Sequence, residues 1–211
     1  MSRGSNPRFQ RRKAGRDLKV ILIVCLGEET EKNYFKAFPT GDAHEVQVEG
    51  RGVNPSNLVQ KAKGLFDQNP KKYSDVWVVF DRDDFEQDIH KACKAARKEG
   101  FQVAYSISCF EFWVLLHFED GEGFKGYKCK DYCKLIREKY IPDYEKNHPD
   151  LYQLLNDSLP EGAEHATRQD LAIERAKLSC SWHQGPLNQG DPSSSVWKLV
   201  ELLNALARAS K

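Results

Sequence analysis

Apolar runs of strand length that alternate with segments of helical spacing constrain this 211-residue chain more than any other feature. Leu18–Cys25 is apolar almost throughout, and Asp75–Phe80 (DVWVVF) is rich in β-branched and aromatic residues. A continuous apolar run predicts a strand that is covered on both faces, which is typical of a parallel sheet. Short strands separated by helices predict right-handed β–α–β units. We therefore expect an α/β fold built on a parallel sheet.

The second half of the chain has helical spacing. The expected strands are 18–25, 45–49, 75–80 and 101–106, and the expected helices are 30–38, 54–66, 85–99, 110–118, 127–140, 169–182 and 193–209. Thr30 and the run Asp191-Pro192-Ser193-Ser194 have the residue types of helix starts, and Gly100 that of a helix end. This predicts three segments: a flexible basic arm (1–16), an α/β core (17–120) and a helical extension packed on the core (121–211).

The basic charges concentrate at the N-terminus. Residues 1–19 carry a net charge of +6, while the whole chain carries +1, which leaves about −5 for the remainder. Such an arm is typical of proteins that contact nucleic-acid phosphates, although a solubilising tail has the same composition. Both interpretations stay open.

Composition predicts a soluble cytoplasmic protein without a membrane segment. The chain is 40% hydrophobic and 30% charged, and no stretch reaches the roughly 18 to 20 apolar residues of a membrane helix. The six cysteines lack the spacing of a disulfide framework, which fits a reducing compartment. Cys129 and Cys133, with Cys180 and His183, are the residue types of a zinc site, but their spacing is unusual for one, and thiols four residues apart also simply share a helix face.

Acidic residues follow two of the predicted strands. Glu28 and Glu31 lie in the loop after the first strand, and Asp81 and Asp83 in the sequence DRDD after the third. In parallel sheets ligands bind beyond the carboxyl ends of the strands, where these carboxylates would meet. Carboxylates suit Mg²⁺ or Mn²⁺, and two such ions can activate water and stabilise the leaving oxygen during phosphodiester cleavage. The alternative is that the glutamates are solvent-exposed residues at the start of a helix and bind no metal.

Four motifs together resemble one family over about residues 18–203. VCLGEETEKNYF (24–35), VVFDRDDF (78–85), SISCFEFWVLLHF (106–118) and GDPSSSVWKLVELL (190–203) resemble motifs of the RloB-like family. That family is associated with restriction loci and is similar to the second component of AbiL-type abortive-infection systems. The acidic loop and the D-x-D pair also resemble the TOPRIM fold of topoisomerases, primases and OLD-type nucleases.

The resemblance implies a TOPRIM-like parallel sheet and a magnesium-dependent nuclease that acts as an anti-phage effector. It implies Asp81 and Asp83 as metal ligands, and Glu28 and Glu31 as further ligands or as the base that activates water. It also implies an ABC-type or AAA-type ATPase as partner beside nucleic acid. The sequence does not distinguish DNA from RNA and does not give the oligomeric state.

One departure from the family pattern keeps two other functions open. Leu26 stands where the family has a glutamate directly before the glycine, and in TOPRIM enzymes that glutamate binds metal or transfers a proton. A catalytically impaired module that binds nucleic acid or the ATPase is one alternative, and a sensor of a small nucleotide is another. Glu111, in an aromatic helix, is either a catalytic residue or the partner of a lysine or arginine. His117 has the context of a core histidine.

Overall fold

The computed structural model describes residues 20–48, 54–82, 88–181 and 192–209. Its elements, in chain order, are β1 (Val20–Cys25), α1 (Thr30–Lys36), a 3₁₀ turn (Gly41–Ala43), β2 (His44–Val48), α2 (Pro55–Gln68), β3 (Tyr73–Asp81), α3 (Ile89–Lys98), β4 (Gln102–Ile107), α4 (Phe110–Leu115), α5 (Cys129–Lys139), α6 (Leu151–Leu155), α7 (Arg168–Ser181), β5 (Ser193–Ser194) and α8 (Val196–Ala209).

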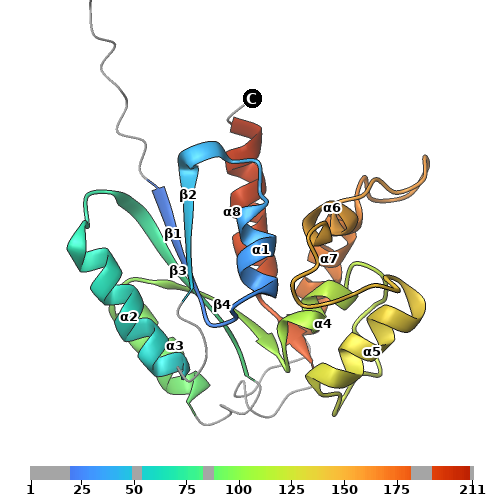
Figure 1. Ribbon diagram of the computed structural model, residues 1–211, viewed down its shortest axis with the longest axis horizontal. Coiled ribbons are helices and arrows are strands. Elements are labelled where there is room, and N and C mark those ends of the chain that lie inside the picture. Colours follow the sequence, from blue (N-terminus) through green and yellow to red (C-terminus); the bar gives the residue numbers. More distant parts are fainter. Residues whose placement is uncertain (1–19, 49–53, 83–87, 182–191, 210–211) are drawn as a thin grey trace, which may run out of the picture.

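The strands form one sheet in the order β2-β1-β3-β4-β5 (Figure 1). The first four strands are parallel, and β5 pairs antiparallel with the end of β4. The chain therefore has the α/β fold expected from its apolar runs, and the architecture is consistent with a TOPRIM-like fold. Parallel pairing also brings the carboxyl ends of β1, β3 and β4 to one edge of the sheet.

Side chains alternate between the two faces of the sheet, as the pleat requires. Leu22, Val78 and Phe80 pack into a cluster with apolar residues of α2 and α3 on one face. Ile23 and Val79 belong to a larger cluster on the other face, with residues of α1, α4 and α8. Figure 1 shows α2 and α3 on one side of the sheet and α1 and α8 on the other. Coverage of both faces explains why β1 and β3 are apolar in continuous runs.

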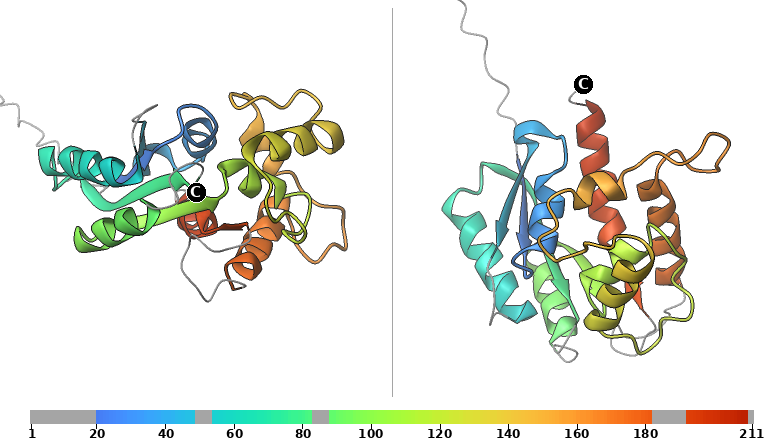
Figure 2. Two further views of the ribbon diagram at one scale, coloured as in Figure 1. Left: turned by 90° about the horizontal axis from the view of Figure 1, so that it is seen from below. Right: turned by 45° about the vertical axis from the view of Figure 1, so that its right-hand side comes forward.

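The helices after α4 continue the larger cluster and do not build a separate core. Tyr132 of α5, Ala172 of α7 and Leu199 of α8 are fully buried in it. Polar contacts also join the halves: Gln169 donates to the Tyr34 hydroxyl at 3.1 Å. Figure 2 shows α5, α6 and α7 grouped beside the sheet. Among the described helices, none combines the length and the apolar character needed to span a membrane.

Some helix ends are those that the sequence predicts. Asn54 caps α2, because its side-chain oxygen accepts a hydrogen bond from the Asn57 N–H at 2.8 Å. Gly100 follows α3 with a φ of 78°, a left-handed conformation that glycine adopts without strain. By contrast, Glu29 occupies the N-cap position of α1 and Thr30 is the first helical residue, with no side-chain cap bond. The predicted cap at Thr30 is therefore wrong by one residue.

The predicted helix 193–209 is also wrong at its start. Ser193 and Ser194 form β5, and α8 begins only at Val196. Ser195 explains the difference, because its N–H donates to the Tyr105 carbonyl at 2.9 Å and its hydroxyl accepts from the Tyr105 N–H at 3.0 Å. The basic arm, the first part of the helix predicted at 85–99, and the loop at 183–190 lie outside the described residues.

Candidate functional site

The loop after β1 and the end of β3 lie at the same edge of the sheet. Cys25, the last residue of β1, is in register with Val79, and the Leu26 N–H donates to the Val79 carbonyl at 2.9 Å. Asp81 ends β3 two residues further on. The structure thus brings the loop that holds Glu28 and Glu31 to the edge where Asp81 lies.

Glu31 is buried at this edge, and Gly27 makes room for it. Its side chain is 4% exposed although it lies in the first turn of α1. A Cβ atom on Gly27 would lie 2.0 Å from Oε2 and 2.2 Å from Oε1 of Glu31, so the carboxylate packs directly against the glycine backbone. A side chain at position 27 would therefore force the Glu31 carboxylate to move from its place. In the sequence Gly-x-x-x-Glu, the glycine thus leaves the space that the carboxylate of the glutamate occupies.

Glu31 and Asp81 act electrostatically on one buried thiol. Burial is the main cause that raises the pKa of Cys25 well above its usual value, and the negative charges of Glu31 and Asp81 raise it further. The strand register places both carboxylates near this thiol. Cys25 and its partner Val79 belong to the cluster on the α1 side of the sheet, and Asp81, two residues beyond Val79 on the same strand, lies on the same side.

The other carboxylates predicted for this edge differ in position. Glu28 is exposed in the same loop, and Asp83 lies outside the described residues. Leu26, in the position of the family's glutamate, is half-buried and packs against the cluster under α2 and α3. It behaves as an apolar core residue on the face opposite to that of Cys25.

Glu111 lies in a different environment. It is 1% exposed, in the first turn of α4. The Cys129 thiol donates to its Oε2 at 3.1 Å, the Tyr144 hydroxyl donates to Oε1 at 3.3 Å, and the Lys146 Nζ lies 3.7 Å from Oε1. Burial raises the pKa of Glu111 to about 7, the charge of Cys129 adds to this, and the ammonium of Lys146 opposes it. The lysine partner allowed for in the sequence is therefore present.

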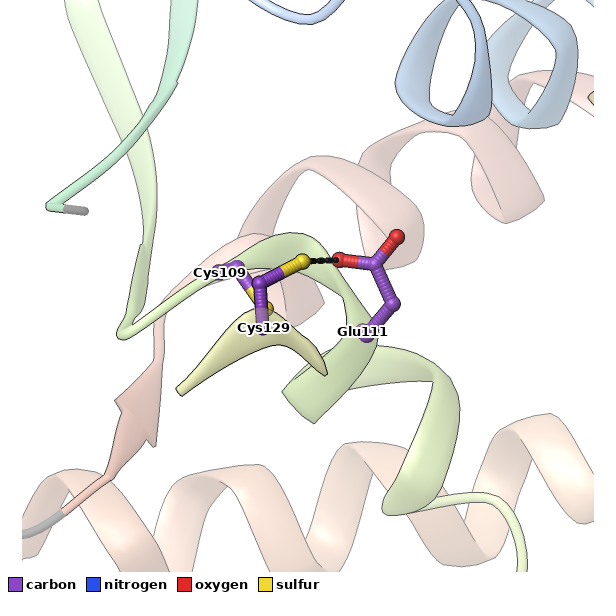
Figure 3. Close-up of side chains that lie close together, drawn as sticks. All are labelled: Cys109, Glu111 and Cys129. Carbon is purple, nitrogen blue, oxygen red and sulfur yellow. Dashed lines mark hydrogen bonds between the residues drawn. The ribbon is translucent and has the colours of Figure 1, made fainter. Parts of the chain in front are cut away.

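Glu111 belongs to a cluster of potential metal ligands with Cys109 and Cys129 (Figure 3). One ligand atom from each of the three residues lies within 4.8 Å of the others, and among the described residues this is the group of three that does so. Glu28, Glu31 and Asp81 do not form such a closed group by themselves. Burial is the main cause that raises the pKa of Cys109, and the negative charges of Glu111 and Asp81 also raise it.

The sequence made a zinc set of Cys129, Cys133, Cys180 and His183 conceivable but unfavoured, and among the described residues Cys180 is not in the group that contains Cys129. Cys180 donates to the Ser194 carbonyl at 3.2 Å, beside β5, and His183 lies outside the described residues. Cys109 replaces Cys180 as the neighbour of Cys129. Sequence reasoning missed this pair because 20 residues separate the two thiols and Cys109 reads as a buried apolar residue.

His117 is a core residue, as its context predicts. Its ring is 2% exposed, donates from Nδ1 to the Trp113 carbonyl at 2.9 Å and packs edge-on against the Trp113 ring. Burial lowers the pKa of His117 to about 3, so the imidazole is neutral. It makes no contribution to the acidic edge.

Comparison with known proteins identifies one family. The family model described as "RloB-like protein" matches residues 21–203, which is most of the chain. Searches of curated proteins and of solved structures found no match.

Proposed function

Because the chain belongs to the RloB-like family, we propose that it is a nuclease that uses Mg²⁺ or Mn²⁺ to cleave phosphodiester bonds of nucleic acid as an anti-phage effector. The observation that carries the proposal is the buried carboxylate of Glu31, fixed against Gly27 at the edge where β3 ends in Asp81. A rigidly held carboxylate beside a second one is what a hard cation needs from a protein.

The donor set fits Mg²⁺ or Mn²⁺ better than a softer metal. Glu31 and Asp81 offer carboxylate oxygens, and the exposed Glu28 and the neighbouring Asp83 add more of the same chemistry. Magnesium keeps several water ligands, so carboxylates that do not close around it still suit it. When bound, the ion would lower the pKa of a water molecule and stabilise the charge on the leaving oxygen.

The chain's own residues have separate tasks in this proposal. Gly27 sets the position of Glu31, and the β1–β3 register sets the position of Asp81 relative to it. Glu28 is an exposed carboxylate of the loop that solvent and substrate can reach. The catalytic role expected for Glu111 is left out of the proposal, because its contacts are with Cys129, Tyr144 and Lys146.

The second candidate is a module that binds nucleic acid or a partner ATPase without cleavage. The packing of Leu26 against the α2–α3 cluster favours it, because a leucine there supplies no ligand and no proton. The two candidates differ in one measurable property, since only the first predicts cleaved product.

A cleavage assay separates them. Purified protein is incubated with tRNA, single-stranded DNA and duplex DNA, in Mg²⁺, in Mn²⁺ or in EDTA. We expect cleavage of at least one substrate in Mg²⁺ or Mn²⁺ and none in EDTA. Binding of these substrates without cleavage under any condition supports the second candidate, and binding of only a small nucleotide supports a sensor.

Substitutions of Asp81 and Glu31 test whether the carboxylates at this edge of the sheet are responsible for cleavage. Asp81→Asn and Glu31→Gln should each lower the rate by about 100-fold or more, because residues that only orient metal ligands already contribute about 10- to 100-fold. Glu29→Gln is the matched control, since Glu29 is an exposed carboxylate of the same loop. An equal loss in all three variants would indicate a general effect of charge and not a ligand set.

A further inference from the structure

We propose that Cys109, Glu111, Cys129 and Cys133 bind one Zn²⁺ ion, which fastens α5 to the turn between β4 and α4. The site is distinct from the carboxylate edge, because its ligands are mainly thiols. Its test is also independent of nuclease activity.

The ligands come from two elements that meet at this point. Cys109 is the N-cap residue of α4 and Glu111 lies in its first turn, while Cys129 is the first residue of α5. Figure 3 shows the three side chains converging, with the Cys129 sulfur directed at one oxygen of Glu111. Segments 20 residues apart thus present ligand atoms within 4.8 Å of one another.

This spacing is close to that of a zinc site. Two thiolates on a tetrahedral zinc ion, at about 2.3 Å each, lie about 3.8 Å apart. The Cys129 sulfur and the Glu111 oxygen are 3.1 Å apart, and the ligand atoms of Cys109, Glu111 and Cys129 all lie within 4.8 Å of one another. Rotations of the side chains alone can therefore bring the ligand atoms to zinc-binding distances.

Cys133 supplies the fourth ligand. It follows Cys129 by four residues on α5, so the two thiols share a face of the helix. Its side chain is 8% exposed. Its sulfur is not one of the three ligand atoms that lie within 4.8 Å of one another, so binding of the ion requires a rotation of the Cys133 side chain. Three thiolates and one carboxylate complete the four positions of a closed, structural zinc site.

Lys146 and Tyr144 form the surroundings that such an ion requires. A zinc ion with three thiolates and a carboxylate carries a net charge of −2, and the Lys146 ammonium lies 3.7 Å from the carboxylate to offset part of it. The Tyr144 hydroxyl donates to the same oxygen and orients the carboxylate. Partners of this kind commonly fix the ligands of metal sites.

The composition of the cluster favours zinc over magnesium. Zinc binds thiolates strongly, whereas magnesium prefers oxygen ligands in an octahedral arrangement. Thiols that serve only as buried apolar residues have other neighbours, as Cys93 does in the cluster under α3. The Cys129 thiol, by contrast, donates to the Glu111 carboxylate, and the Cys109 sulfur lies within 4.8 Å of both ligand atoms.

Cobalt substitution tests the site. Protein that has been stripped of metal under reducing conditions is titrated with Co²⁺, and the sulfur-to-cobalt charge-transfer absorption is recorded. We expect one equivalent to bind with the d–d bands of a tetrahedral site, and one equivalent of Zn²⁺ to displace it. Zn²⁺ should also protect three of the six thiols from a thiol reagent.

Three variants and one control assign the ligands. Cys109→Ser and Cys129→Ser should weaken Zn²⁺ binding by more than about 100-fold, and Lys146→Ala by about 10- to 100-fold as a neighbour of the ligands. Cys93→Ser, which removes a buried thiol from the opposite face of the sheet, should leave the stoichiometry and the affinity unchanged. Far-UV circular dichroism of each variant establishes that it is folded.

Three results would overturn the proposal. The first is wild-type protein that shows no charge-transfer absorption with Co²⁺ and no protection by Zn²⁺. The second is an unchanged affinity in folded Cys129→Ser. The third is a disulfide between two of these cysteines in the untreated protein, which mass spectrometry detects as a mass lower by two hydrogen atoms than that of the thiol form and which would make the cluster a redox pair.

Discussion

Gly27 and Glu31 depend on each other at the level of single atoms. The carboxylate fills the space that a side chain at position 27 would need, since a Cβ atom there would lie 2.0 Å from Oε2. A packed contact of this kind resists change, because the interior tolerates little extra volume. The glycine of the acidic loop is therefore required for the position of the carboxylate.

Gly27→Ala should lower the free energy of unfolding by about 1–3 kcal/mol, as overpacking does. Gly64→Ala is the matched control: Gly64 lies in α2, a Cβ atom there would meet nothing within 4 Å, and the change should stabilise the protein by about 0.5–1 kcal/mol. Urea denaturation measures the free energy of unfolding of both variants.

In the double variant Gly27→Ala with Glu31→Ala, most of the loss of stability caused by the alanine at position 27 should disappear. Additive losses would show that the two residues are not coupled.

His117 gives a second prediction at this scale. Burial lowers the pKa of its imidazole to about 3, and the charges of Arg175 and Arg168 act in the same direction. Histidine has a pKa of about 6.5 in the unfolded chain. Between about pH 6.5 and pH 3 the unfolded chain therefore binds a proton at this residue, whereas the native state does not. The stability from this difference is complete above about pH 6.5 and is lost as the pH falls toward 3.

At pH 5.5, His117 alone should therefore cost about 1.4 kcal/mol of stability relative to pH 7.5. The measurement is urea unfolding at both pH values for wild type and for His117→Gln, an uncharged variant that retains a donor. The difference in pH dependence between the two proteins isolates His117. Equal pH dependence in both would mean that the ring is protonated in the native state.

The elements of the α/β half were predictable, and the reason is physical. β1 and β3 are covered on both faces, so their apolar runs stand out without any knowledge of neighbouring strands. β5 was not predictable, because two serines in an edge strand have no apolar pattern and are also common at helix starts. The Cys109–Cys129 contact was missed since it depends on how α5 packs against α4.

Hydrogen bonds between Ser195 and Tyr105 connect the residue after β5 to β4. The Tyr105 N–H donates to the Ser195 hydroxyl at 3.0 Å, and Ser195→Ala would leave that N–H without its acceptor. We expect a loss of about 1–3 kcal/mol in urea denaturation. Ser179→Ala is the control: its hydroxyl only donates to the Ala176 carbonyl of its own helix, so its loss should stay below about 1 kcal/mol. Equal losses would mean that β5 does not depend on this bond.

At the scale of the whole chain, the basic N-terminal residues and the acidic edge lie in different parts of the sequence. The described body carries the acidic edge, and the sequence places six of the chain's arginines and lysines in residues 1–16. The family match begins after this arm, at residue 21. The basic arm therefore lies outside the part of the chain that the family model matches.

Deleting residues 1–16 should weaken nucleic-acid binding and reduce its dependence on salt, by a slope of about 0.9 for each phosphate that the arm contacts in duplex DNA. The thermal unfolding of the protein should not change. The measurement is the dissociation constant across a salt titration, with a control protein in which the six cations are replaced by serine at constant length. An unchanged slope in both proteins would show that the arm only improves solubility.

Binding of Mg²⁺ at the carboxylate edge tests the central claim most directly. Protein dialysed free of divalent ions is melted without and with Mg²⁺, an ion that does not compete for thiols, in wild type, Asp81→Asn and the control Glu29→Gln. A ligand present at 100 times its dissociation constant stabilises the folded state by about 2.7 kcal/mol, which corresponds to a rise in Tm of about 5–10 °C for a chain of this size. Our account predicts this rise in wild type and in Glu29→Gln, and none in Asp81→Asn. Wild-type protein that melts at the same temperature with and without Mg²⁺ would contradict it.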